Sequence, residues 1–144
     1  MNLRDELNSF YYSTALCDLR LMNRKIDGKN LSYNSLLYLE LIHSMHGKCT
    51  ASAIAELTGV SKPGVTSKLN ELYNAGYIIK TPDIMDKRKI YLEVNEDKLP
   101  LFRIYKKQDE LVLKRLNEHF SEADIEKFCK MLSIITEINY NEEY

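Results

Sequence analysis

The chain has 144 residues, of which 44% are hydrophobic and 28% are charged, and its formal net charge at pH 7 is −1. This length fits one domain, or one module with helical extensions, and the composition is that of a globular chain. No apolar run is long enough to span a membrane, and the charged N-terminus lacks the apolar core of a signal peptide. We therefore expect a cytoplasmic protein with no membrane partner.

A long helix is predicted over residues 2–25. Apolar and small residues recur in it at alternating spacings of four and three, the pattern of a helix that packs along another helix. The pattern consists of Leu3, Leu7, Phe10, Thr14, Cys17 and Leu21. Because this helix precedes any domain core, we expect it to pack against a second subunit. Residues 27–30, with Gly28, predict a break after it.

The next helix is predicted to begin at a Ser32 N-cap and to end near Gly47. Its apolar residues lie on several faces, which predicts a central position. A short helix then begins at a Thr50 N-cap and ends at Gly59, where a positive φ is least costly. We expect Ile54 and Leu57 of this helix to face inward.

A second short helix is predicted to begin two residues later, at a Ser61 N-cap. Val65, Leu69 and Leu72 form its buried stripe at helical spacing, and Gly76 ends it. The other positions carry short donors, acceptors and cations, which reach phosphates and base edges of DNA. The candidate DNA contacts here are Ser61, Lys62, Pro63, Gly64, Thr66, Ser67 and Lys68.

Two strands are predicted next, over 77–80 and 89–94, with Ile90, Leu92 and Val94 facing inward. Residues 48–49 are a candidate short third strand. The loop between the two strands is long and ends in three cations, which is typical of a wing that lies along a minor groove. Its candidate DNA contacts are Asp86, Lys87 and Arg88.

The charge distribution agrees with a DNA-binding role for this segment. Residues 59–92 carry six cations and three anions, a net charge of +3, so the rest of the chain sums to −4. A basic segment in an otherwise acidic chain presents one face to a polyanion.

Two further helices are predicted, from 101 to 119 and from a Ser121 cap, where Asp124 completes a capping box. Three long amphipathic helices thus flank a small module that does not need them for its own core, so we expect them to form a dimer interface. A two-fold dimer matches a near-palindromic DNA site.

The sequence therefore predicts a mainly α fold with a small β-wing, in one chain over 1–144. A winged helix-turn-helix DNA-binding module at 31–95 would be flanked by dimerisation helices at 1–26 and 100–140. The chain carries no nucleophile elbow, no phosphate loop and no metal-ligand spacing, so we predict no enzyme activity, no cofactor and no metal site.

This order of elements resembles the MarR family of bacterial transcriptional regulators. The segments 59–62, at the start of the recognition helix, and 86–88, at the end of the wing, carry the resemblance, together with the run from Leu69 to Ile78. The resemblance implies a homodimer whose recognition helices enter successive major grooves. It also implies that Arg88 reaches a minor groove and that Asp86 orients it. Such proteins usually repress transcription.

Many members of the family release DNA when a small lipophilic ligand binds or when a cysteine is oxidised. Tyr11, Tyr12 and Tyr38 are candidates to line such an effector pocket, although tyrosines of this kind more often belong to a core or an interface. Cys17 is a candidate redox site, but its place in the apolar pattern of the first predicted helix also fits a packed residue. One alternative function is a winged-helix module that binds proteins and no longer reads DNA, and the other is a regulator switched by oxidation of Cys17.

Overall fold

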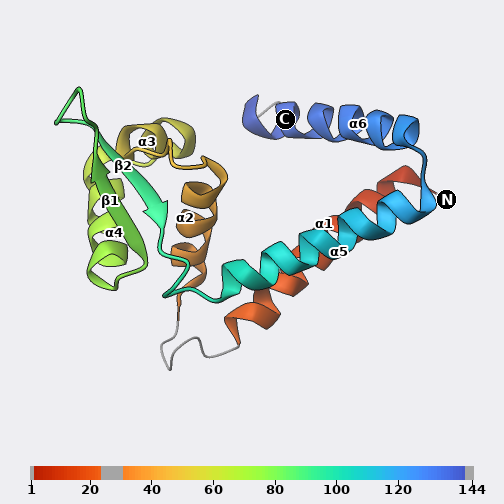
Figure 1. Cartoon of the computed structure of the whole chain (residues 1–144), viewed down its shortest axis with the longest axis horizontal. Coiled ribbons are helices and arrows are strands. Elements are labelled where there is room, and N and C mark those ends of the chain that lie inside the picture. The colour runs from red at the N-terminus through yellow and green to blue at the C-terminus, as the bar shows by residue number, and fades with distance from the viewer. Residues whose placement is uncertain (1, 24–30, 142–144) are drawn as a thin grey trace. The chain divides into compact units, whose positions relative to one another are not determined.

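The structure is a computed structural model that describes residues 2–23 and 31–141 (Figure 1). The predicted break at 27–30 and the predicted helix end at 25 lie outside the described residues. The chain forms two compact units, Met1–Phe102 and Arg103–Tyr144. The elements in chain order are α1 (Leu3–Met22), α2 (Tyr33–Ser44), α3 (Ala51–Thr58), α4 (Lys62–Asn74), β1 (Ile78–Pro82), β2 (Ile90–Val94), α5 (Leu101–His119) and α6 (Glu122–Asn141). This arrangement confirms the predicted fold class of helices with a small β-wing.

Side-chain caps set the starts of the helices around the turn. The hydroxyl of Thr50 accepts a hydrogen bond from the amide of Ala53 at 3.2 Å, and that of Ser61 accepts one from the amide of Gly64 at 3.3 Å. Between the two helices Gly59 has a φ of 67°, the left-handed conformation that glycine adopts at little cost. The predicted caps and the turn are therefore confirmed.

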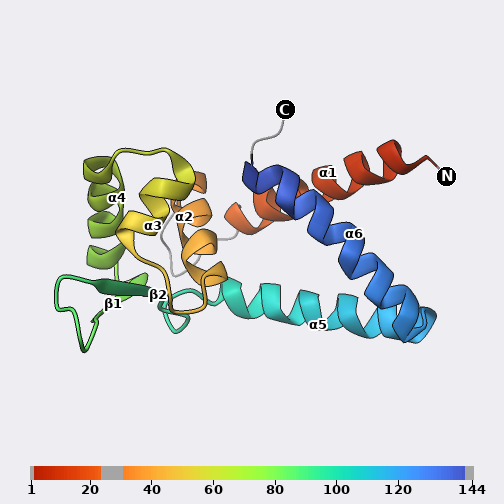
Figure 2. The same cartoon turned by 90° about the horizontal axis from the view of Figure 1, so that it is seen from above.

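The first unit has one small core, to which α2, α3, α4 and both strands contribute. In it α3 contacts α4, α4 contacts β1, and α2 contacts β2, an arrangement that Figures 1 and 2 show from two sides. The predicted stripe of α4 is buried as expected. The core side chains from these elements are Leu36, Leu39, Ile42, Ile54, Val65, Leu69, Leu72, Ile78 and Leu92.

Leu57 corrects one of the predictions. Ile54 is fully buried, but Leu57 is 48% exposed. A helix of only eight residues presents a narrow face to a small core, and Ile54 with the half-buried alanines around it already occupies that face. Helical spacing alone therefore overstated the buried width of α3.

The strands form an antiparallel pair in which Ile78 lies opposite Val94 and Pro82 opposite Ile90. The first strand lies later than the predicted range 77–80, since it begins at Ile78 and continues through Pro82, where a proline at the end of a strand is tolerated. Leu92 is buried as predicted, whereas Val94 is half-buried. The expectation that Ile90 faces inward was wrong: it is 43% exposed, because this end of the hairpin projects away from α3 and α4 (Figures 1 and 2).

The candidate third strand is reduced to a single bridge. Cys49 pairs with Leu92, and the Leu92 amide donates a hydrogen bond to the Cys49 carbonyl at 2.9 Å. Cys49 itself is fully buried, and this burial raises the pKa of its thiol to about 11. The thiol therefore stays neutral and shielded inside the module.

The second unit consists of most of α5 and all of α6. Its turn follows the predicted capping box: the Asp124 carboxylate accepts from the Ser121 amide at 3.3 Å, and the Ser121 hydroxyl accepts from the Asp124 amide at 3.3 Å. None of the twenty residues of α6 is buried. Among residues 2–23 and 31–141, no helix is both long and apolar enough to cross a bilayer.

Substitutions in α3 test the position of the core. We expect Ile54→Ala to lower the free energy of unfolding by about 2–5 kcal/mol, because it removes a fully buried side chain and leaves a cavity. The matched variant Leu57→Ala, on the same helix, should cost less than about 1 kcal/mol. Urea unfolding followed by circular dichroism measures both, and equal losses would contradict the described orientation of α3.

Candidate nucleic-acid interface

The polar side chains of α4 are exposed because its apolar stripe is buried. Val65 and Leu69 anchor the helix in the core, and this leaves the other positions from 61 to 67 exposed. The exposed candidates are Ser61, Lys62, Pro63, Gly64, Thr66 and Ser67. The helix dipole adds a partial positive charge at the same end of α4.

Gly64 has a structural reason to lack a side chain. A Cβ atom at this position would lie 3.1 Å from a methyl group of Val60 and 3.2 Å from the hydroxyl of Ser61. Glycine therefore lets the turn lie close to the start of α4, where Ser61 caps it. Gly64 shapes the exposed end of α4 in addition to leaving its backbone accessible.

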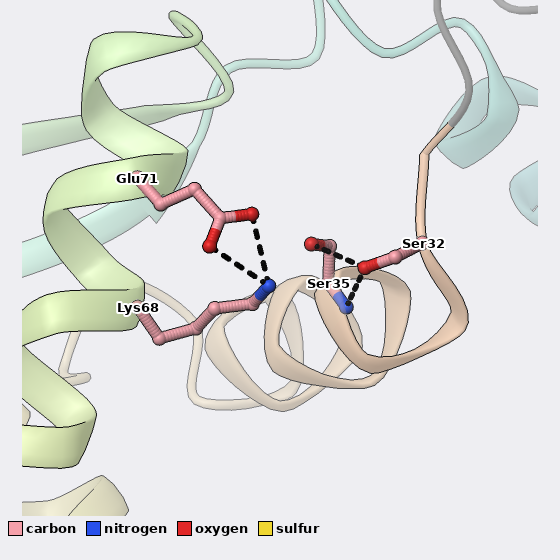
Figure 3. A network of polar contacts seen from close by, with 4 residues as sticks. All are labelled: Ser32, Ser35, Lys68 and Glu71. Atoms are coloured by element: carbon pink, nitrogen blue, oxygen red, sulfur yellow. Dashed lines mark hydrogen bonds and ion pairs between the residues drawn. The ribbon is translucent and has the colours of Figure 1, made fainter.

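Lys68 differs from the other candidates on α4. Its ammonium donates to both carboxylate oxygens of Glu71, at 3.0 and 3.2 Å, and its side chain is only 14% exposed. Figure 3 shows this ion pair extending from α4 toward the first turn of α2, where Ser32 and Ser35 hydrogen-bond to each other. The structure thus gives Lys68 an internal partner, and its contact with DNA stays a prediction.

A contact that the sequence reasoning missed joins α4 to the wing. The Lys80 ammonium donates to the side-chain carbonyl of Asn70 at 3.0 Å and lies 4.7 Å from the centre of the Tyr73 ring. An ammonium group that donates a hydrogen bond to an amide and also lies over an aromatic ring is restricted to few side-chain conformations. This contact ties β1 to the recognition helix. Polar residues ten positions apart give no local sequence signal for it.

The loop between β1 and β2 is held by its own hydrogen bonds. One carboxylate oxygen of Asp83 accepts from the amides of Met85 and Asp86, both at 2.8 Å. The Asp83 amide donates to the Lys89 carbonyl at 2.8 Å, and the Lys89 amide donates to the Asp86 carbonyl at 2.9 Å. The hydrogen bond from the Asp86 amide, followed by that from the Met85 amide, holds the pKa of the Asp83 carboxyl below its ordinary value.

Arg88 is presented to solvent by Asp86. The Asp86 carboxylate accepts from the Arg88 amide at 3.1 Å and from its Nε at 3.3 Å, while 93% of the Arg88 side chain is exposed. Asp86 therefore holds the Nε atom of Arg88 and leaves the end of the guanidinium accessible, while the role of both residues toward DNA stays a prediction. Next to it, the Lys89 ammonium lies 5.1 Å from the Tyr91 ring, and a hydrogen bond with Tyr91 raises the pKa of Lys89.

The tyrosines predicted to line an effector pocket lie on two helices. Tyr11 and Tyr12 are 44% and 73% exposed on α1, and Tyr38 is half-buried on α2. A cavity of about 360 Å³ lies between the end of α2 and the strands, and it includes His43, Glu93 and Glu96 among its lining residues. The tyrosine pocket stays a prediction.

The histidines and cysteines were also placed by the structure. The centre of the His43 ring lies 4.8 Å from that of the Phe102 ring, with the two planes tilted by 45°. The Nδ1 atom of His43 lies 3.9 Å from Oε1 of Glu96, whereas Cys49 is buried in the core. Within the described part of the chain, no group of three His, Cys, Asp or Glu side chains could hold a metal ion. Cys17 is half-buried on α1, and its redox role stays a prediction.

Two capped helices joined by a glycine turn, followed by a hairpin with a basic loop, define a winged helix-turn-helix protein. The model of the MarR family matches residues 29–89, which cover α2, α3, α4, β1 and the wing loop. In this segment the chain is similar to the MarR family of transcriptional regulators.

Three known proteins illustrate the similarity. An uncharacterized HTH-type transcriptional regulator of Bacillus subtilis, YfiV, is 27% identical over 107 residues, which are 74% of this chain and 66% of that protein, just under two thirds of its length. The crystal structure of Streptococcus pneumoniae FabT in complex with DNA superposes with a TM-score of 0.66 at 19% identity, covering 96% of both chains. The adhesin competence repressor AdcR of Streptococcus pyogenes gives a TM-score of 0.57 at 21% identity, covering 95% of this chain and 97% of its own. The two solved structures share the fold with this chain.

Asp83 offers a test of the order in the wing loop. We expect Asp83→Ala to speed hydrogen exchange at the amides of Met85 and Asp86, because both lose their acceptor, while Asp83→Asn keeps one acceptor oxygen and much of the protection. In the unmodified chain the same amides should lose protection as the pH falls through the depressed pKa of Asp83, and keep it above that value. NMR-detected exchange measures this, and unchanged rates in the alanine variant would show that the loop is held in another way.

Proposed function

We propose that this chain is a sequence-specific transcriptional regulator that binds double-stranded DNA as a homodimer and represses its target genes. The observation that carries the proposal is the pairing, in one module, of an exposed polar recognition helix with a wing that presents Arg88. The FabT structure in complex with DNA and the designation of AdcR as a repressor support it.

The recognition helix α4 would enter the major groove, which is wide enough for one helix and displays a distinct pattern of donors and acceptors for each base pair. Thr66 and Ser67, two exposed hydroxyls, would contact base edges. Lys62 would contact a phosphate, which the positive end of the α4 dipole also favours. Such contacts fix the position of the helix without reading sequence. A protein-interaction module would have no need for exposed cations at these positions.

The wing would place Arg88 in the adjacent minor groove. A narrow minor groove has an enhanced negative potential that attracts arginine, and Asp86 restrains the guanidinium at 3.3 Å so that less freedom is lost on binding. The hydrogen bonds of Asp83 keep the loop in shape before DNA arrives. The wing loop is therefore ordered before it binds DNA.

The homodimer is proposed from the apolar faces that α1 and α6 leave exposed. On α1 these faces include Leu3, Phe10 and Tyr12, between 57% and 74% exposed. On α6 they comprise Phe128, Met131, Leu132, Ile134, Ile138 and Tyr140. Apolar surface of this extent on a chain of ordinary composition indicates an interface between subunits, and a second copy would place two recognition helices on a near-palindromic site.

Release from DNA by a small-molecule effector is the remaining part of the proposal. The candidate pocket residues are Tyr11 and Tyr12 on α1 and Tyr38 on α2. In a dimer, an exposed tyrosine on α1 would come close to a subunit boundary. A ligand there would change affinity for DNA only to the extent that it prefers one arrangement of the two modules.

Arg88 provides the main test of DNA binding. We expect Arg88→Ala to weaken binding to DNA from the region upstream of its own gene by about tenfold or more, because a minor-groove cation is lost. The control is Lys114→Ala on α5, which also removes an exposed, ion-paired cation and should leave affinity unchanged. Fluorescence anisotropy at several salt concentrations measures both. Equal binding of the unmodified chain to scrambled DNA would contradict sequence-specific recognition.

The dimer can be tested on α6. We expect Ile134→Asp to convert a dimer to a monomer, because it would bury an unpaired carboxylate in the interface, whereas Ser133→Asp should not. Ser133 lies on the polar stripe of α6 that also carries Glu126, Lys130 and Glu137. Sedimentation equilibrium measures the mass of each variant, and a monomeric unmodified chain would refute this part of the proposal.

A further inference from the structure

Two apolar side chains stand at the tip of the wing, where the loop leaves the protein. Ile84 and Met85 are each 94% exposed, more than any other large apolar side chain in the described residues, where the next is Leu3 at 74%. Unlike the exposed residues of α1 and α6, they belong to no helical face. The DNA contacts predicted for this loop were Asp86, Lys87 and Arg88, and Ile84 and Met85 had no predicted role.

The exposure of the tip is built into the loop. Asp83 accepts hydrogen bonds from the amides of Met85 and Asp86 at 2.8 Å, and Lys89 closes the loop against Asp83 and Asp86. These bonds fix the backbone on both sides of Ile84 and Met85. The two side chains are therefore held outward by the backbone, and each stays 94% exposed in the described part of the chain.

The groups around the tip indicate its partner. Asp83 and Asp86 direct their carboxylates to backbone amides and to Arg88, so their charges are partly neutralised within the loop. Lys87, Arg88 and Lys89 follow directly, and these cations favour a polyanion. A DNA groove offers phosphates to the cations and the faces of stacked bases to the apolar pair, so this combination of side chains fits DNA.

We propose that Ile84 and Met85 form an apolar wedge that enters the minor groove beside Arg88 and partly unstacks a base step of the bound DNA. Isoleucine and methionine are among the side chains that insert between base steps in this way. The inference rests on the proposed DNA-binding function and adds a second means of recognition to it. With Arg88 alone, the wing would sense only the width of the minor groove. With the wedge, it would also deform the DNA.

This wedge predicts sequence preference at base pairs that make no hydrogen bond with the protein. Unstacking is least costly at pyrimidine–purine steps such as TA and CA/TG. We therefore expect such a step at a fixed distance outside the base pairs read by α4, once in each half-site.

The test uses duplexes that the unmodified chain selects from a pool of random sequence, with 2-aminopurine placed in turn at each flanking position. The fluorescence of this base rises when it is unstacked. For the unmodified chain we expect a rise at one step in each half-site. The double variant Ile84→Ser/Met85→Ser should abolish that rise, weaken binding by about tenfold, and remove the preference for a pyrimidine–purine step, with an unchanged thermal midpoint.

A matched control separates the wedge from the charge of the wing. Lys87→Ala removes a neighbouring cation from the same loop, so it should lower the salt dependence of binding by about one phosphate equivalent and keep the fluorescence rise. The double serine variant should show the opposite result, with the salt dependence retained and the fluorescence rise lost.

The failure of this inference can be told apart from the failure of the proposed function. If the unmodified chain selects no sequence from the pool, the DNA-binding function fails, and the wedge fails with it. If it selects sequences but no flanking position brightens, or if the double serine variant behaves like the unmodified chain, the wedge is refuted and DNA binding stands. Sedimentation with phosphatidylglycerol vesicles that depends on Ile84 and Met85, with unchanged DNA binding, would also refute it and assign the tip to a lipid surface.

Discussion

The burial of one stripe of α4 is the constraint on which the rest of this structure depends. Val65, Leu69 and Leu72 enter the same small core as Leu92 of β2, so the recognition helix and the wing are fixed to a common base. Because these side chains face the core, Thr66 and Ser67 on the other side of the helix face outward. The contact of Lys80 with Asn70 adds a second tie between the two elements. The proposed reading of two adjacent grooves requires this shared base, since a mobile wing would lose entropy on every encounter with DNA.

The contacts of each charged side chain decide where the module presents charge to solvent. The formal net charge does not show this. Lys68 is neutralised by Glu71 and largely covered. In contrast, the carboxylates of Asp83 and Asp86 are turned into the loop by backbone amides, and Arg88 remains exposed beside them. The net result is a positive charge concentrated at the start of α4 and at the wing. A surface charge in these places acts on phosphates at short range, even in a chain whose total charge is close to zero.

Sequence rules predicted the features that local chemistry decides. The caps at Thr50 and Ser61, the turn at Gly59 and the stripe of α4 depend on neighbours within one or two helical turns, and each is found as expected. The features that depend on distant neighbours were missed. Leu57 and Ile90 have the right period for burial but are 48% and 43% exposed, and the partner of Lys80 lies on another element. The exposure of Ile84 and Met85 follows from the turn that Asp83 makes, which alternation of apolar residues does not reveal.

The exposed apolar surface of this chain is of two kinds, and size separates their uses. A stable interface between proteins buries about 800 Å² on each partner, which the faces of α1 and α6 can supply over several turns of helix. Two side chains at the wing tip cannot approach that area, so a flat protein surface would gain little from them. A narrow groove surrounds an inserted side chain on several sides and buries most of it. The cations that follow the tip, and the restraint that Asp83 places on it, make the minor groove the surface that Ile84 and Met85 fit best.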